Sequence, residues 1–238
     1  MKIFVIGKNN FLYWDQHVKE AFENLGHTVK HFQINNRPAS IQFTRGILKG
    51  LLGKKRGNRL SNNIHIKLLK KELEIFKPDL IFFTSAMFIP IEFYEAVNSL
   101  SFKPKIFAWE GDGGSNNERF NTHVPYIDIL FESDKSYVND NKLGFKNILH
   151  LPLAANPNVY KDYGNIRENK SYFCGSWIVD RDETFSRLID FDIVYRGWNW
   201  DKLTAKSDSF DIKLGTVDIK DQIDDYLFFS EIREEYPE

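Results

Sequence analysis

The sequence has a single cysteine, Cys174, among its 238 residues. One cysteine excludes an intramolecular disulfide, a cysteine-based zinc site and an iron–sulfur cluster, and it fits a reducing, cytoplasmic setting. Long apolar runs are also missing, because no stretch approaches the ~18 consecutive apolar residues of a membrane-spanning helix. The first seven residues have the composition of a strand rather than of a signal peptide. We therefore expect a cytoplasmic protein whose membrane contact, if any, is peripheral at the inner membrane surface.

Several catalytic signatures are absent as well. The sequence contains no H-E-x-x-H, no G-x-S-x-G and no G-x-x-x-x-G-K-[ST], which argues against a zincin, a typical α/β-hydrolase and a P-loop NTPase. Residues 180–182 form a D-x-D triplet. About one such triplet is expected by chance with this many aspartates, so we interpret Asp180 as a helix N-cap and predict no metal site.

Acidic residues are missing from a long stretch of the chain, although the formal charge is only −1. Residues 24–71 contain no Asp or Glu and eleven Lys or Arg, whereas residues 218–238 carry eight acids and two basic residues. Such a separation predicts a face that meets an anionic partner, with a solvated face as the alternative. Within Arg45–Arg59, Leu and Ile alternate with Lys and Arg as in an amphipathic interfacial segment. We expect a peripheral membrane contact there, or an exposed loop, and no nucleic-acid binding.

Apolar patterning predicts alternating strands and helices over residues 1–155. A strand at 2–6, a helix at 15–25 and a strand at 28–34 form a βαβ unit, which implies a parallel sheet. The pattern continues with helices at 64–76, 91–100 and 135–143 and with strands at 80–84, 105–109, 127–132 and 148–151. We therefore predict a doubly wound α/β domain.

A second α/β pattern begins further along the chain. The polar, proline-containing stretch before it predicts a linker at 156–170. Beyond it we expect strands at 171–174, 192–195 and 212–217 and helices at 182–189 and 220–229. The predicted fold is therefore two Rossmann-like domains with doubly wound parallel sheets, at 1–155 and 171–238, the second of them incomplete.

Ligands of doubly wound sheets bind beyond the carboxyl ends of the strands, so the loops there hold the candidate site residues. Gly7 and Asn9 follow the first strand and could turn N–H groups toward an anion, or could only make a turn. Glu110 and Asp112 follow a buried strand among glycines and could supply a general base for a substrate hydroxyl, with a flexible polar turn as the alternative. His123 could serve as the base instead, or be structural.

The second domain supplies the other candidates, which lie after predicted strands or at the start of a predicted helix: Gly175, Ser176, Arg181, Arg196, Gly197 and Trp198. Arg181 opens a helix whose N-terminal N–H groups favour phosphate. Arg196 offers a phosphate fork, and Trp198 offers a flat face for a nucleotide base. Packing of the tryptophans between domains is the alternative.

Together these motifs resemble the glycosyltransferase families related to the spore-maturation (CgeB-like) proteins. The residues that carry the resemblance are Trp109-Glu110-Gly111-Asp112, Ile129–Asp134 with Tyr137 and Gly144, Leu151–Pro157, Tyr172–Ser176 with Arg181, and Val194–Trp198. The resemblance implies a GT-B fold, in which an N-terminal domain takes the acceptor and a C-terminal domain takes a nucleotide-diphosphate sugar, usually without a metal or another cofactor. It places the six second-domain candidates in the donor pocket with Gly7 and Asn9 facing them, and Glu110 and Asp112 on the acceptor side.

The sequence departs from this pattern at its end. Family members continue through a glutamate-containing donor motif and a final helix, whereas this sequence ends at Glu238. We predict a metal-independent, hexosyltransferase-like glycosyltransferase that moves a sugar from a nucleotide-diphosphate donor to a hydroxyl of a glycan, lipid or protein. The alternatives are a non-catalytic GT-B-derived protein that binds a nucleotide, sugar or protein partner, including a second copy as a homodimer, and a basic accessory protein of the membrane surface.

Overall fold

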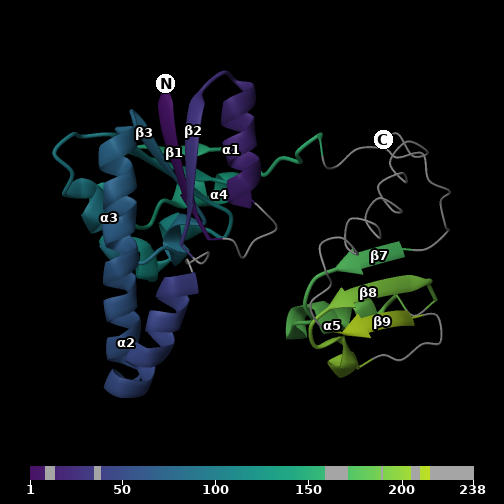
Figure 1. Cartoon of the computed structure of the whole chain (residues 1–238). Coiled ribbons are helices and arrows are strands. Elements are labelled where there is room, and N and C mark those ends of the chain that lie inside the picture. Colours follow the sequence, from purple (N-terminus) through teal and green to yellow (C-terminus); the bar gives the residue numbers. More distant parts are fainter. Residues whose placement is uncertain (9–13, 35–38, 159–170, 189, 205–209, 215–238) are drawn as a thin grey trace. The chain divides into compact units, whose positions relative to one another are not determined.

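The computed structural model describes residues 1–8, 14–34, 39–158, 171–188, 190–204 and 210–214. The chain divides into two units, residues 1–154 and 155–238 (Figure 1). Asn9, the helix expected at 220–229 and most of the expected linker lie outside the described residues. Within the described part, no helix is both long and apolar enough to cross a bilayer.

The first unit is built on a six-stranded parallel sheet. Its strands are β1 (Lys2–Gly7), β2 (Thr28–Gln33), β3 (Leu80–Thr84), β4 (Lys105–Glu110), β5 (Ile129–Glu132) and β6 (Ile148–His150). Their order across the sheet is β2-β1-β3-β4-β5-β6, so the chain turns to opposite sides after β1 and the sheet is doubly wound. The carboxyl ends of β1 and β3 therefore flank the point where ligands of such sheets bind.

Helices cover both faces of this sheet. They are α1 (Trp14–Asn24), α2 (Ala39–Phe76), α3 (Ile91–Asn98) and α4 (Lys135–Asp140), with 3-10 turns η1 (Ala86–Phe88), η2 (Gly114–Asn116) and η3 (Glu118–Tyr126). Successive residues of a strand point to opposite faces. Accordingly, Phe4 and Ile6 of β1 join the larger core with α2 and α3, while Ile3 and Val5 pack with Val18 of α1. Every residue of β3 is buried, as predicted for a strand covered on both sides.

Helix α2 is much longer than the helix predicted at 64–76. Residue Gly53, with φ 78° and ψ 161°, divides it into two arms, which Figure 1 shows running away from the sheet and back. A Cβ on Gly57 would lie only 2.6 Å from the backbone nitrogen of Lys49, so glycine lets the arms pack against each other. The segment Arg45–Arg59, expected as an interfacial segment or an exposed loop, is thus part of a helical hairpin.

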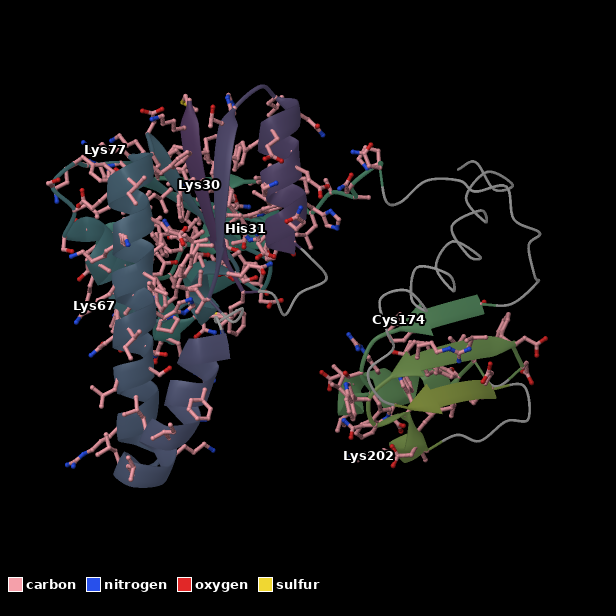
Figure 2. The ribbon with its side chains drawn as sticks, viewed as in Figure 1. Lys30, His31, Lys67, Lys77, Cys174 and Lys202 are labelled. Carbon is pink, nitrogen blue, oxygen red and sulfur yellow. The ribbon has the colours of Figure 1, made fainter. Side chains whose placement is uncertain are left out.

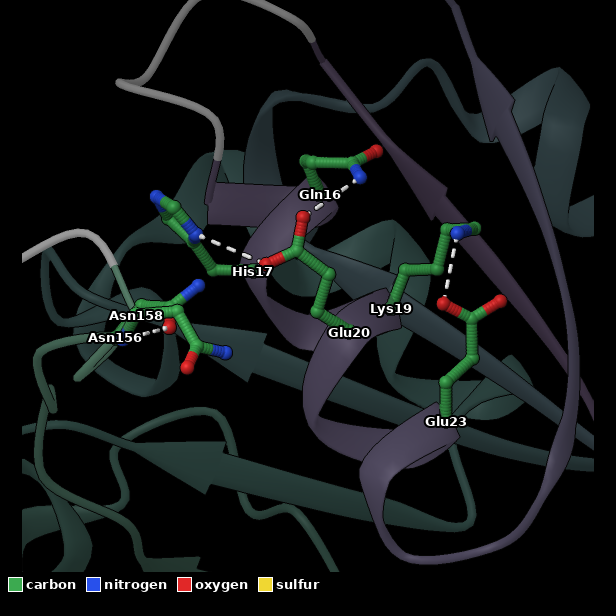
Figure 3. A network of polar contacts seen from close by, with 7 residues as sticks. All are labelled: Gln16, His17, Lys19, Glu20, Glu23, Asn156 and Asn158. Atoms are coloured by element: carbon green, nitrogen blue, oxygen red, sulfur yellow. Dashed lines mark hydrogen bonds and ion pairs between the residues drawn. The ribbon is translucent and has the colours of Figure 1, made fainter.

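Helix α1 carries a polar outer face held by pairs within the helix. Gln16 Nε2 donates to Glu20 Oε1 at 2.9 Å, and Lys19 Nζ donates to Glu23 Oε2 at 2.8 Å (Figure 3). His17 Nδ1 lies 3.9 Å from the other carboxylate oxygen of Glu20. Such pairs, three or four residues apart, stabilise a surface helix by a few tenths of a kcal/mol each, about 0.2–0.5.

The second unit has a three-stranded parallel sheet in its described part. The strands β7 (Ser171–Cys174), β8 (Ile193–Gly197) and β9 (Phe210–Leu214) lie in that order. Helix α5 (Val179–Ser186) and the turn η4 (Trp200–Lys202) complete it. Its core is aromatic, with Phe173, Phe185 and Tyr195 around the fully buried Trp200.

The start of α5 corrects one prediction. The N-cap is Ile178 rather than Asp180, which lies in the first turn of the helix, where a negative charge favours the helix dipole. The other aspartate of the D-x-D triplet, Asp182, accepts hydrogen bonds from Trp177 Nε1 at 3.0 Å and from the Thr204 hydroxyl at 2.6 Å. Both aspartates therefore have structural roles.

Candidate functional site

Two buried glutamates lie side by side at the carboxyl ends of β4 and β5. Glu110 and Glu132 are register partners, and neither side chain reaches solvent. One oxygen of Glu110 accepts the N–H of Met87, and Glu132 Oε1 accepts the N–H of Ser115 at 2.6 Å. The second oxygen of each carboxyl group is buried and has no hydrogen-bond partner among the described residues.

Burial is the main reason why the pKa of each carboxyl group is raised. It raises the pKa of Glu110 to about 8, the Met87 N–H opposes the shift, and the nearby charges of Glu132 and Asp112 add to it. Burial likewise raises the pKa of Glu132. At neutral pH Glu110 is therefore mostly protonated and can donate a proton. A role as general base at this residue requires a pH near or above 8.

Asp112 is exposed two residues further on, at the rim of an open hollow of about 480 Å³. The other residues that line the hollow are Gly113, Asn116, Asn117, Glu118, Arg119 and Tyr137. Gly113 has φ 71°, and a Cβ there would lie 2.5 Å from Tyr137 Cζ, so only glycine fits this turn. Amide, carboxylate and guanidinium groups around an open space suit a ligand that bears hydroxyl groups.

His123 lies away from this hollow, in the core. Its Nε2 donates to the carbonyl oxygen of Ile89 at 2.9 Å, and its ring packs against Tyr94 and Phe120, each at 4.9 Å between ring centroids. Burial lowers the pKa of His123. These are the contacts of a structural histidine, the alternative that the sequence left open, and its role as a base stays a prediction.

Gly7 ends β1 at a point where no side chain fits. A Cβ there would lie 2.4 Å from Asp15 Cβ and 2.5 Å from Thr84 Oγ1. The glycine thus brings the start of α1 and the end of β3 against the β1 terminus. Ser85, which follows β3, has the left-handed backbone with φ 49° and ψ 48°, a strained conformation that is common near functional sites.

A histidine–aspartate pair beside Gly7 was missed by the sequence analysis. Asp15 Oδ2 lies 2.7 Å from His31 Nε2 and accepts from Gln33 Nε2 at 3.3 Å. Burial acts to raise the pKa of Asp15, but the hydrogen bonds and charge of His31 outweigh it and leave the pKa lowered. Figure 2 labels His31 on β2. The sequence does contain a sign of this cluster. His31 and Gln33 are two residues apart on a predicted strand, so both side chains lie on the same face of the sheet.

Five of the second-unit candidates gather at the carboxyl edge of β7 and β8: Gly175, Ser176, Arg181, Gly197 and Trp198. Arg181 Nη1 donates to the Ser176 carbonyl at 2.5 Å, and its guanidinium lies 5.2 Å from the Phe173 ring centroid. Gly197 has φ 136° and faces Gly175 so closely that a Cβ would lie 2.3 Å from the Gly175 carbonyl oxygen. We call these five residues the β7–β8 edge.

The remaining candidate, Arg196, has a buried side chain that pairs with a residue of the neighbouring strand. Its side chain is 4% exposed, and Nη2 lies 3.1 Å from Asp211 Oδ2 on β9. The tryptophans divide between two roles. Trp200 is buried and donates to the Gly175 carbonyl at 2.7 Å, whereas Trp198 is 55% exposed. The packing of the tryptophans between domains, which the sequence left open, stays a prediction.

The described residues offer no obvious metal centre. Among them, no group of three or more His, Cys, Asp or Glu side chains is placed to hold a metal ion. The prediction of a metal-independent site stays a prediction.

Comparison with known proteins identifies the fold. No family model and no curated protein matches the chain. The co-structure of S. aureus MnaA with UDP matches with a TM-score of 0.55 at 13% identity, covering 95% of this chain and 71% of that one. A Listeria monocytogenes structure assigned as a UDP-N-acetylglucosamine 2-epimerase matches with a TM-score of 0.54 at 11% identity and the same coverage. The chain therefore has the predicted α/β, GT-B-like fold of two parallel-sheet units, with a smaller second sheet.

Proposed function

We propose that this protein is a glycosyltransferase that uses a nucleotide-diphosphate sugar and transfers the sugar to a hydroxyl group. The observation that carries the proposal is the β7–β8 edge, in a chain with the fold of nucleotide-sugar enzymes. An exposed tryptophan suits a nucleotide base, an arginine suits phosphate, and glycines let backbone N–H groups approach an anion. A finer kinship with CgeB-like glycosyltransferases is part of this proposal, and the motifs quoted above support it.

The acceptor side of the proposed reaction is the hollow beside Asp112. Asp112 is the proposed general base, because its exposed carboxylate can reach an acceptor hydroxyl in the hollow. Glu110, protonated at neutral pH, is a hydrogen-bond donor behind it. Arg181 and backbone N–H groups of the β7–β8 edge would stabilise the departing diphosphate.

We expect Asp112→Asn to lower the turnover of the donor sugar by about 10²- to 10⁴-fold, the usual contribution of a general base. Release of UDP from UDP-N-acetylglucosamine and UDP-glucose, with water or a simple glycoside as acceptor, measures this. The affinity for UDP should not change. Glu118→Gln is the matched control, since Glu118 is also exposed and lines the same hollow. Unchanged turnover in Asp112→Asn, or an equal loss in Glu118→Gln, would contradict the role of Asp112.

A non-catalytic nucleotide- or sugar-binding protein is the second candidate. The observation that favours it is the pairing of Arg196 with Asp211, which removes one of the two predicted phosphate-binding arginines from the ligand side. Such a protein would have less positive charge with which to stabilise a leaving diphosphate. Binding of UDP without any release of UDP from its sugars would favour this candidate.

A further inference from the structure

The bent end of α2 carries apolar side chains that nothing in the described structure covers. We define the hairpin tip as residues 43–60, on either side of the break at Gly53. Phe43, Ile47 and Leu51 recur at four-residue spacing on the first arm, which places them on one face of the helix. Phe43 is 73% and Leu51 is 77% exposed. Single exposed apolar residues are ordinary, but a continuous exposed stripe marks an interaction surface.

This stripe lies on the side of the first arm that faces away from the second arm. Arg45, Lys49 and Gly57 mark the opposite side, since Gly57 packs against the backbone of Lys49 and both basic residues are half-buried. The stripe is thus not the packing seam of the hairpin. Figure 1 shows the tip as the part of α2 furthest from the sheet, so neighbouring elements of the unit leave it accessible.

The charge of the hairpin tip has one sign. Residues 43–60 contain six Lys or Arg and no Asp or Glu, and the acid-free stretch extends from residue 24 to residue 71. Lys54 and Arg56, next to the break, are exposed. Further along the second arm, Lys67 is exposed as well (Figure 2). The tip therefore combines an apolar stripe with a surplus of positive charge.

We propose that the hairpin tip docks onto the surface of an anionic lipid bilayer. In this geometry Phe43, Ile47 and Leu51 enter the boundary between headgroups and acyl chains, while the exposed Lys54 and Arg56 contact the anionic headgroups. Charge complementarity selects this occupant. A nucleic acid would use the cations but leave the aliphatic stripe in water, and a second copy of the tip would bring like charges together. The docking surface shares no residue with the β7–β8 edge or with the Asp112 hollow.

The test is flotation of the full chain with phosphatidylcholine vesicles, with and without phosphatidylglycerol. We expect binding only to the anionic vesicles, and weaker binding at higher salt because exposed charges are screened. Lys54→Gln with Arg56→Gln should weaken it by about 10- to 30-fold, since each cation near an anionic surface contributes about 1 kcal/mol. Phe43→Ser with Leu51→Ser should weaken it by at least about tenfold, through lost apolar burial.

Matched controls separate docking from general effects of charge and hydrophobicity. Lys142→Gln with Lys146→Gln removes two exposed lysines elsewhere on the unit, and Leu25→Ser with Ile75→Ser removes two equally exposed apolar side chains. Both controls should bind the anionic vesicles like the wild type. Equal binding to neutral vesicles, no binding to either, or equal losses in the controls would overturn the proposal. So would a concentration-dependent dimer in sedimentation that Phe43→Ser with Leu51→Ser abolishes while vesicle binding is absent.

Discussion

Glu110→Gln is expected to abolish most of the loss of stability that the wild type shows between about pH 5 and about pH 8.5. The pKa of Glu110 is about 8 in the folded chain, against 4.5 without the protein environment. Between these values the native state keeps a proton that the unfolded chain has released. The stability contribution of the protonated group is therefore complete below pH 4.5 and is lost as the pH rises to 8.

The size of this effect follows from the shift, at about 1.4 kcal/mol per pKa unit, which gives on the order of 3 to 5 kcal/mol. Urea denaturation of wild type and variant at a series of pH values measures it as the difference between the two curves. Glutamine keeps the oxygen that accepts the Met87 N–H but cannot ionise. Glu95→Gln, an exposed change on α3, should retain the pH dependence of the wild type. Parallel curves for wild type and Glu110→Gln would show that Glu110 is ionised in the native state.

Gly197→Ala is expected to destabilise the second unit by about 3 kcal/mol or more and to remove nucleotide binding with it. The added Cβ would lie 2.3 Å from the Gly175 carbonyl oxygen and 2.8 Å from its carbonyl carbon. Both are backbone atoms, so relief requires β7 and β8 to separate. The φ of 136° adds strain that only glycine avoids. The same movement would displace Trp200 Nε1 from the Gly175 carbonyl and disturb the aromatic core.

Hydrogen exchange measured by mass spectrometry, in peptides that cover β7 and β8, reports this loss directly. Gly144→Ala is the matched control. Gly144 also has a positive φ, of 70°, but its Cβ would meet nothing within 4 Å. Gly144→Ala therefore introduces the strain of a side chain at positive φ, about 1–2 kcal/mol, without a steric clash against a neighbouring strand. Protection of β7 and β8 in Gly197→Ala equal to that in the wild type would contradict the close approach of the two strands.

The sequence predicted the strands of the fold well, because a short, continuous run of apolar and β-branched residues is typical of a buried parallel strand. The run of five apolar and β-branched residues at β3 and the strand Ser171–Cys174 have the expected bounds. The sequence did not predict that the first arm of α2 is helical, because glycines at 46, 50, 53 and 57 lower the intrinsic helix propensity of this segment. Tertiary packing reverses that judgement, since Gly57 is what allows the two arms to approach.

The candidate site was only partly accessible from the sequence. Glu110 and Asp112 stood out because they directly follow a buried strand. Glu132 did not stand out as their partner, since its position beside Glu110 depends on the order and register of β4 and β5. Likewise, the contact of His31 with Asp15 depends on β2 lying next to β1. Candidate residues within one loop can thus be predicted from the sequence. Contacts between side chains of neighbouring strands can be predicted only when the order of the strands in the sheet is known.

Titration calorimetry with UDP, GDP, CDP and dTDP tests the central claim most directly, namely that the β7–β8 edge holds a nucleoside diphosphate. We expect one of these nucleotides to bind, and Arg181→Gln to weaken its binding by at least about tenfold. Arg187→Gln, an exposed change at the other end of α5 where the arginine pairs with Glu183, should leave the affinity unchanged. No binding of any of the four nucleotides, or equal affinities in wild type and Arg181→Gln, would contradict the account.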